Sequence, residues 1–181
     1  RLQREIGITT IYVTHDQDEA MALSTRMALL DRGQVIQIGT PADIYRRPRT
    51  RFVAEFLGGA NLLPGTLRSG PNGRLVEIAG RHRLAVPAVE YQDGCSVFCL
   101  VRPEAVRLAP GESEEPNRLA ATVSGALYLG GRYECEITLS GGVTMRVEMG
   151  AGATTTAPKP GDPVSVVIPP EEIIVLPAAE T

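Results

Sequence analysis

The sequence predicts a mainly β protein that begins with a small α/β segment. Near residue 60 the mixed α/β patterning gives way to a stretch dense in glycine and proline. Turn signals such as Asp93-Gly94 recur there at short spacing, and the segments between them alternate in polarity. Many short strands without helices are typical of a small β-barrel. We therefore expect two units, residues 1–60 and 61–181, of which the second is the barrel.

The first unit opens with an apolar, β-branched run from Ile8 to Val13. Such a run fits a buried strand of a parallel sheet. Asp16 then occupies a helix N-cap position, and Glu19 follows it three residues later, as in a capping box. We expect a helix over residues 17–25.

A hairpin and two short helices complete the first unit. The apolar segments 27–30 and 34–38 flank a turn at Gly33, which is typical of a hairpin. Thr40 and Thr50 each precede a short segment with an apolar face, so each predicts a helix N-cap.

The second unit contains nine candidate strands and two loops. Residues 109–118 and 150–160 are polar or rich in small residues and predict exposed loops. No internal repeat is evident. The candidate strands cover residues 74–79, 83–86, 96–101, 106–108, 121–129, 133–139, 144–148, 164–168 and 173–176.

The composition narrows the class of protein. A formal net charge of −3, from 18 basic and 21 acidic residues, disfavours a nucleic-acid binder, which usually has a basic face. No apolar run reaches the ~18 residues of a membrane span, and the polar residues 1–5 are unlike a signal peptide. Cys95, Cys99 and Cys135 form no Cys-x-x-Cys pair, which favours reduced thiols in a cytosolic protein over a metal site.

His15 directly follows the predicted first strand. In open α/β sheets, ligands bind at the carboxyl ends of the strands. His15 could contact a phosphate or an attacking water there. Alternatively, it only completes the turn between strand and helix, and its position alone leaves both interpretations open.

Residues 13–21, Val-Thr-His-Asp-Gln-Asp-Glu-Ala-Met, resemble the switch-histidine segment of ABC transporter ATP-binding subunits, in the polyamine, iron and sugar importer group. The resemblance continues in register through residues 26–48 and through the Phe-Val-Ala-Glu-Phe-Leu-Gly-Gly-Ala-Asn crossing at 52–61. Segments 101–104 and 128–130 resemble motifs of the OB-like regulatory barrel of the family, the transport-associated OB (TOBE) domain.

The resemblance implies that His15 is the switch histidine, which contacts the γ-phosphate of ATP. It also implies that the parent subunit uses ATP and Mg to drive solute uptake. The phosphate loop needs the pattern G-x-x-x-x-G-K-[ST], yet Lys159 is the sole lysine and no such loop precedes it. The family also needs a Leu-Ser-Gly-Gly signature and an Asp-Glu pair that ends the preceding strand, and both are missing here. We expect a C-terminal fragment that neither binds nor hydrolyses ATP alone.

The family resemblance also predicts the partners: a second copy in a homodimer and the membrane subunits of the importer, on the inner face of the cell membrane. The segment Phe-Leu-Gly-Gly-Ala-Asn-Leu-Leu-Pro-Gly at 56–65 resembles polyamine, ferric-iron and phosphonate importers more than the maltose type. Without sheet neighbours, the apolar run 8–13 is a template for pairing with another copy, so we expect residues 1–60 to be rearranged, or to swap or pair in a dimer.

Two further segments have alternative interpretations. Gly130, Gly131 and Arg132 could hold a small oxyanion through backbone N–H groups, or simply form a hairpin turn. The first interpretation implies a stand-alone oxyanion-binding module, the alternative to the ATPase subunit. Arg102-Pro103-Glu104 could contact an anion, but we expect it instead to fix the end of a strand, since proline sets the backbone and arginine can pair with a nearby carboxylate.

Overall fold

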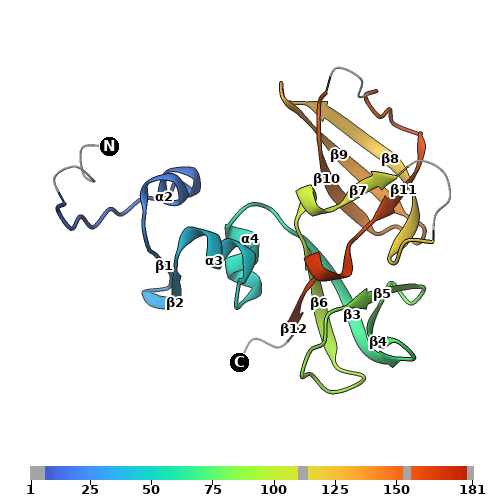
Figure 1. The fold of residues 1–181 in the computed structure, drawn as a ribbon, viewed down its shortest axis with the longest axis horizontal. Coiled ribbons are helices and arrows are strands. Elements are labelled where there is room, and N and C mark those ends of the chain that lie inside the picture. Colours follow the sequence, from blue (N-terminus) through green and yellow to red (C-terminus); the bar gives the residue numbers. More distant parts are fainter. Residues whose placement is uncertain (1–6, 110–113, 153–155, 179–181) are drawn as a thin grey trace. The chain divides into compact units, whose positions relative to one another are not determined.

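The computed structural model describes residues 7–109, 114–152 and 156–178 (Figure 1). The chain divides into two compact units, residues 1–49 and 50–181. The contacts thus place helix α4 (Arg51–Phe56) with the β-rich unit, before the boundary expected at residue 60. The mainly β fold class is confirmed, whereas the assignment of residues 1–60 and 61–181 as domains stays a prediction.

The first unit contains the expected helices and hairpin. Its elements are α2 (Gln17–Leu23), β1 (Met27–Asp31), β2 (Gln34–Gly39) and α3 (Pro41–Arg46). The Asp16 side chain accepts the Glu19 N–H at 3.0 Å, and the Thr40 hydroxyl accepts the Asp43 N–H at 3.2 Å. Both N-caps are confirmed, because each side chain satisfies a backbone donor that the first turn leaves unpaired.

Residues 8–13 do not form the buried strand that their sequence predicts. They lie outside any sheet, and the side chains of Ile11 and Val13 are each 90% exposed. A strand needs neighbours that accept its hydrogen bonds and cover its apolar faces. Within the described part of the first unit, the only sheet is the β1–β2 hairpin, whose strands pair with each other.

In its described residues, the second unit contains α4, ten strands and two 3₁₀ turns. Of the two expected loops, residues 110–113 and 153–155 lie outside the described residues. The elements after α4 are β3 (Asn61–Gly70), β4 (Gly73–Ile78), β5 (His82–Val86), β6 (Ser96–Val101), η1 (Pro103–Ala105), β7 (Arg107–Ala109), β8 (Arg118–Tyr128), β9 (Arg132–Leu139), β10 (Thr144–Gly150), β11 (Pro163–Val167), η2 (Pro170–Glu172) and β12 (Ile174–Pro177).

Strand β3 is absent from the sequence-based prediction, because Pro64 and Gly65 interrupt its pattern. Proline lacks a backbone donor and is rare in central strands. Here β3 pairs with β6 from Asn61 onward, but its pairing with β4 begins only at Gly65. Pro64 therefore lies before the part of β3 that has neighbours on both sides, where a missing N–H is tolerated.

The ten strands form two five-stranded antiparallel sheets, in the orders β12-β6-β3-β4-β5 and β10-β9-β8-β11-β7 (Figure 1). The series β3 to β7 is repeated by β8 to β12, with η1 and η2 at equivalent places. The last strand of each repeat joins the sheet of the other, so the two repeats are interlocked. The prediction of no internal repeat is therefore wrong. The sequence did not reveal the repeat because the two copies share few residue types.

The shared residues lie at equivalent positions of the two repeats. Asn61 begins the first repeat and Asn117 the second, while Pro103-Glu104 in η1 corresponds to Pro170-Glu171 in η2. Between these points the repeats share mainly polarity, because one core lies between both sheets and accepts any apolar residue of suitable volume. The two repeats share a pattern of polar and apolar residues but few identical residues, so the repeat is not evident from the sequence.

Two buried asparagines join the sheets at these equivalent positions. Asn61 donates to the Arg146 carbonyl at 2.8 Å and accepts the Arg146 N–H at 2.7 Å. Asn117 accepts the Ala85 N–H at 2.6 Å and donates to the carbonyls of Ala85 and Ile168 at 2.8 and 3.0 Å. Each side-chain amide thus acts as an extra peptide unit for an edge strand of the opposite sheet, β10 or β5.

Candidate functional sites

His15 lies at the C-terminal end of the segment that precedes α2. His15 is exposed and immediately precedes the N-cap residue Asp16. The carboxylate of Glu19 accepts hydrogen bonds from the Tyr12 hydroxyl at 2.8 Å and the Thr14 hydroxyl at 3.3 Å, and Thr14 in turn accepts the Asp16 N–H at 3.0 Å. This network brackets His15 on both sides, so it orients the turn that carries the imidazole.

The network also affects the titration of Tyr12. Its hydrogen bond to Glu19, with the negative charge of that carboxylate, raises the pKa of the Tyr12 phenol. The phenol is the donor in this contact, and the Glu19 carboxylate is the acceptor. His15 contributes no bond to this network that would occupy its ring.

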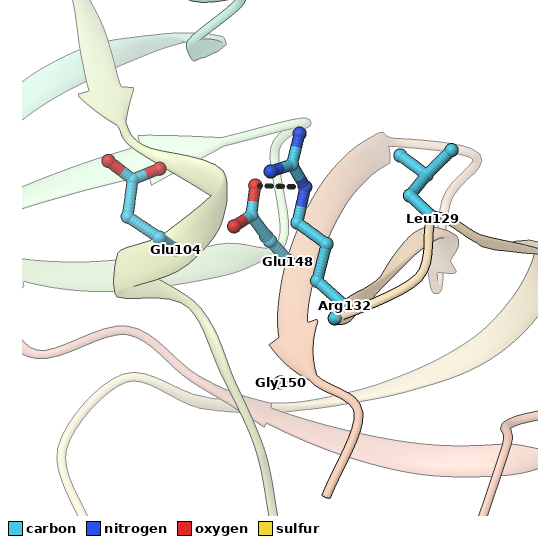
Figure 2. A pocket seen from close by; sticks show the side chains of 6 residues that line it. Glu104, Leu129, Arg132, Glu148 and Gly150 are labelled. Carbon is cyan, nitrogen blue, oxygen red and sulfur yellow. Dashed lines mark ion pairs between the residues drawn. The ribbon is translucent and has the colours of Figure 1, made fainter.

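Gly130 and Gly131 form the turn between β8 and β9, and Arg132 begins β9. The Leu129 N–H donates to the Arg132 carbonyl at 2.8 Å, and Gly130 adopts a left-handed conformation with φ +78°. The hairpin interpretation of this segment therefore matches the geometry. Beside the turn lies a solvent-open pocket of about 510 Å³ (Figure 2), lined by Glu104, Leu129, Gly131, Arg132, Glu148 and Gly150.

The charges of this pocket disfavour an anion. Its lining has two carboxylates, Glu104 and Glu148, and one guanidinium, Arg132. Figure 2 shows the Arg132 guanidinium directed at Glu148, with a closest N–O distance of 3.4 Å. An oxyanion would have to compete with Glu148 for Arg132 and would meet the field of a second carboxylate. The oxyanion role of Gly130, Gly131 and Arg132 stays a prediction, and this balance argues against it.

Arg102 clamps helix α4 to the β-rich unit. It is only 7% exposed, and its Nη1 donates to the carbonyls of Ala54 and Leu57 at 3.2 and 2.6 Å. These carbonyls belong to the last turn of α4, where helical partners are missing and the helix dipole is negative. Arg102 thus satisfies the end of a helix that is some 45 residues away in sequence. Sequence reasoning tied Arg102 to a strand end but missed the helix.

Replacing Arg102 with methionine is expected to lower the free energy of unfolding by about 2–4 kcal/mol, since charge-assisted bonds to two buried carbonyls are lost. Guanidinium chloride unfolding followed by circular dichroism measures this. Arg107→Met serves as the control, because Arg107 is exposed and its ion pair with Glu115 should contribute less than about 1 kcal/mol. Equal losses in both variants would contradict the clamp.

Two of the three cysteines lie where burial disfavours their thiolates. Cys99 and Cys135 are buried and Cys95 is half-buried, and none forms a disulfide. Burial raises the pKa of Cys99 to about 12 and raises that of Cys135 as well. Their thiolates, the forms that bind metals, are therefore disfavoured. Among the described residues, no group of three or more His, Cys, Asp or Glu side chains is placed to hold a metal ion.

Within the described residues, no helix is both long and apolar enough to cross a membrane.

Comparison with known proteins identifies the class of the β-rich unit. Residues 99–176 match the family model of the TOBE domain. A solved structure of the cytoplasmic molybdate-binding protein ModG, with molybdate bound, has a TM-score of 0.51 and 22% sequence identity; the likeness covers 65% of this chain and 96% of that one. At this identity the likeness concerns the fold alone. The OB-like expectation for the second unit is thus supported by both findings.

Relatives of the whole chain are ATP-binding proteins of importers. The chain is 35% identical, over 98% of its length, to the spermidine/putrescine import ATP-binding protein PotA of Pseudomonas fluorescens. It is 36% identical, over 97% of its length, to the Fe(3+) ions import ATP-binding protein FbpC of Photorhabdus laumondii. The chain spans about half the length of these curated relatives, 49% and 47%. The chain is therefore similar to the C-terminal region of ABC importer ATP-binding subunits, and residues 99–176 match the TOBE domain.

Proposed function

We propose that this chain is the C-terminal part of the ATPase subunit of an ABC importer, which couples ATP hydrolysis to the uptake of a polyamine, ferric iron or a similar solute. The similarity to importer ATP-binding proteins over 97–98% of the chain carries this proposal. It includes the segment around His15, which the TOBE match at 99–176 does not. In this proposal the β-rich unit is regulatory and helps to join two copies.

The exposed run from Ile8 to Val13 supports the same proposal. Its apolar, β-branched side chains are 58–90% exposed at Ile8, Ile11 and Val13. Leaving such side chains in water costs roughly 1.5–3 kcal/mol each relative to burial. The part of the relatives that this chain does not match is about as long as the chain itself, and a sheet within that part would bury this run as a strand.

His15 is the residue that we assign to the reaction. At the end of a strand completed in this way, its imidazole would donate a hydrogen bond to the γ-phosphate and hold the attacking water. Phosphoryl transfer depends mostly on positioning and charge stabilisation, so one correctly placed donor has a large effect. ATP and its Mg ion supply the transferred phosphoryl group and neutralise its charge. The residues of this chain supply no phosphate loop, so the fragment alone should be inactive.

The importer assignment also implies partners and location. A second copy and the membrane subunits would complete the transporter, with the subunit on the cytoplasmic face of the membrane. The importer assignment is tested by measuring ATP hydrolysis by a longer subunit that contains residues 1–181 and the region preceding them. We expect hydrolysis by the longer subunit and none by the chain alone. A longer subunit that binds no ATP would contradict the proposal.

Oxyanion binding remains the second candidate, because the fold neighbour ModG is named as molybdate-binding and a pocket lies beside Gly131 and Arg132. Given the two carboxylates in that pocket, isothermal titration calorimetry with molybdate, tungstate and sulfate should show no binding below millimolar concentration. Glu148→Gln releases Arg132 and should improve any weak binding. Micromolar binding to the unmodified chain that Arg132→Ala abolishes would favour the oxyanion module instead.

A further inference from the structure

The outward side of strands β8, β9 and β10 presents a surface that extends beyond the pocket beside Arg132. Residues paired across antiparallel strands lie on the same side of a sheet. Since Cys135 and Val147 are paired and buried in the core, the pairs next to them point outward. We call the outward surface the acidic face and include Glu104, which lines the pocket (Figure 2). Its residues form three rows across the strands, with Leu129, Arg132 and Gly150 in the first, Leu127, Glu134 and Glu148 in the second, and Gly125, Glu136 and Arg146 in the third.

Glycines leave the acidic face open to close approach. A side chain at Gly125, Gly131 or Gly150 would meet no atom within 4 Å beyond its chain neighbours. Glycine inside a strand often marks a place where another backbone approaches closely. Next to these glycines, the side chains of Leu127 and Leu129 are 59% and 43% exposed. The face therefore has room for a partner segment and two apolar side chains that such a segment would cover.

The acidic face carries a net charge of −2, because four carboxylates outnumber two guanidinium groups. Both arginines are already engaged. Arg132 lies 3.4 Å from Glu148, while Arg146 lies 4.0 Å from Glu134 and donates to the Gly59 carbonyl. A partner therefore meets an excess of negative charge. The carboxylates belong to Glu104, Glu134, Glu136 and Glu148.

The equivalent side of the first repeat shows that the fold does not require this charge. There Glu77 pairs with Thr66 and with Arg83, and Arg68 lies in the next row, opposite Leu75. These rows contain two arginines and one glutamate, so their net charge is +1. Since both repeats build the same arrangement of strands, the negative charge is a property of the acidic face and not of the scaffold.

We propose that the acidic face is a docking surface for a partner protein that presents a segment of alternating basic and apolar side chains. Lysine or arginine side chains of that segment meet the carboxylates, and its apolar side chains cover Leu127 and Leu129. Complementary charge speeds the encounter of two proteins and disfavours wrong partners. The inference goes beyond the proposed function and does not depend on it, because no step of it involves ATP.

The spacing of the charges favours a protein segment over a small cation. Successive rows lie two residues apart along the strands, so the three rows span roughly 14 Å. Carboxylates and exposed leucines are distributed along this length, and a single ammonium group reaches only part of it. A linear polyamine has no apolar side chains with which to cover Leu127 and Leu129. An anionic membrane surface is repelled by the net negative charge of the face.

Fluorescence anisotropy with a labelled peptide of alternating lysine and leucine tests the proposal on the 181-residue chain. We expect saturable binding that Glu136→Gln/Glu148→Gln weakens about tenfold, because two carboxylates lose their charge. The matched control is Glu171→Gln/Glu172→Gln, which makes the same change in charge at two exposed residues of η2. Equal weakening in both double variants, absence of binding, or equal binding of a peptide with glutamate in place of lysine would overturn the proposal.

Two further measurements on the unmodified chain locate the bound peptide and test the class of ligand. Backbone amide shifts in NMR spectra should concentrate in β8, β9 and β10 when the peptide is added, and shifts concentrated in β3, β4 and β5 would contradict the proposal. Spermidine at micromolar concentration should not displace the peptide, and displacement would favour a small-cation site instead. ATP hydrolysis by the longer subunit is measured separately, so failure of the importer proposal and failure of this one are distinguishable.

Discussion

Replacing His15 with alanine in the longer ATP-binding subunit is expected to lower the rate of ATP hydrolysis about 100- to 10,000-fold, the range for losing a positioned acid–base or hydrogen-bonding group. Nucleotide binding should change little, because the phosphate loop and Mg hold the ground state. Loss in kcat without a matching rise in KM would show that His15 acts in the transition state. The turn around it, held by Thr14 and Glu19, should keep its geometry.

His82→Ala is the matched control, because it removes the other histidine of the chain from a different unit. The His82 ring contacts the Ser140 carbonyl at 2.5 Å, so its loss should affect stability slightly but leave hydrolysis unchanged. His15→Gln retains a donor and should recover part of the activity. Hydrolysis that is unaffected by His15→Ala would reject the switch-histidine role, even if the subunit proves to be an ATPase.

Replacing Asn117 with alanine should lower the free energy of unfolding by about 3–5 kcal/mol. Three side-chain hydrogen bonds, two of them to Ala85 in the opposite sheet, contribute roughly 1 kcal/mol each, and the left-handed backbone at φ +55° adds about 1–2 kcal/mol of strain for alanine. Since Asn117 is 8% exposed, water cannot replace these bonds easily. Thermal unfolding should show a midpoint lower by roughly 6–20 °C.

Two further variants separate the causes of this loss. Asn117→Gly removes the same hydrogen bonds but relieves the left-handed strain, so it should be the less destabilising of the two. Asn61→Ala, at the equivalent position of the first repeat, loses two side-chain bonds without left-handed strain and should cost about 2 kcal/mol. If Asn117→Ala has the same free energy of unfolding as the unmodified chain, the side-chain hydrogen bonds of Asn117 do not stabilise the packing of the two sheets.

The candidate sites were predicted from the sequence to different degrees. The segment around His15 has a distinctive residue order, so its family and its turn could be predicted; Asp16 caps α2 because an N-cap depends on neighbours within three residues. The role of Arg102 could not be predicted, since its partners Ala54 and Leu57 are chosen by the packing of α4. The charge of the pocket beside Arg132 likewise depends on Glu104 and Glu148, which lie far away in sequence.

The sequence by itself determined the mainly β class, the helix caps at Asp16, Thr40 and Thr50, and nearly all the strands, because these depend on local pattern and turn chemistry. Only the tertiary structure decided which strands pair with one another in the two sheets. Three features depend on which neighbours are present to accept backbone hydrogen bonds. The two repeats exchange their last strands, β3 pairs with β6, and residues 8–13 form no strand. Local pattern states that a segment can be a strand, but pairing decides whether it is one.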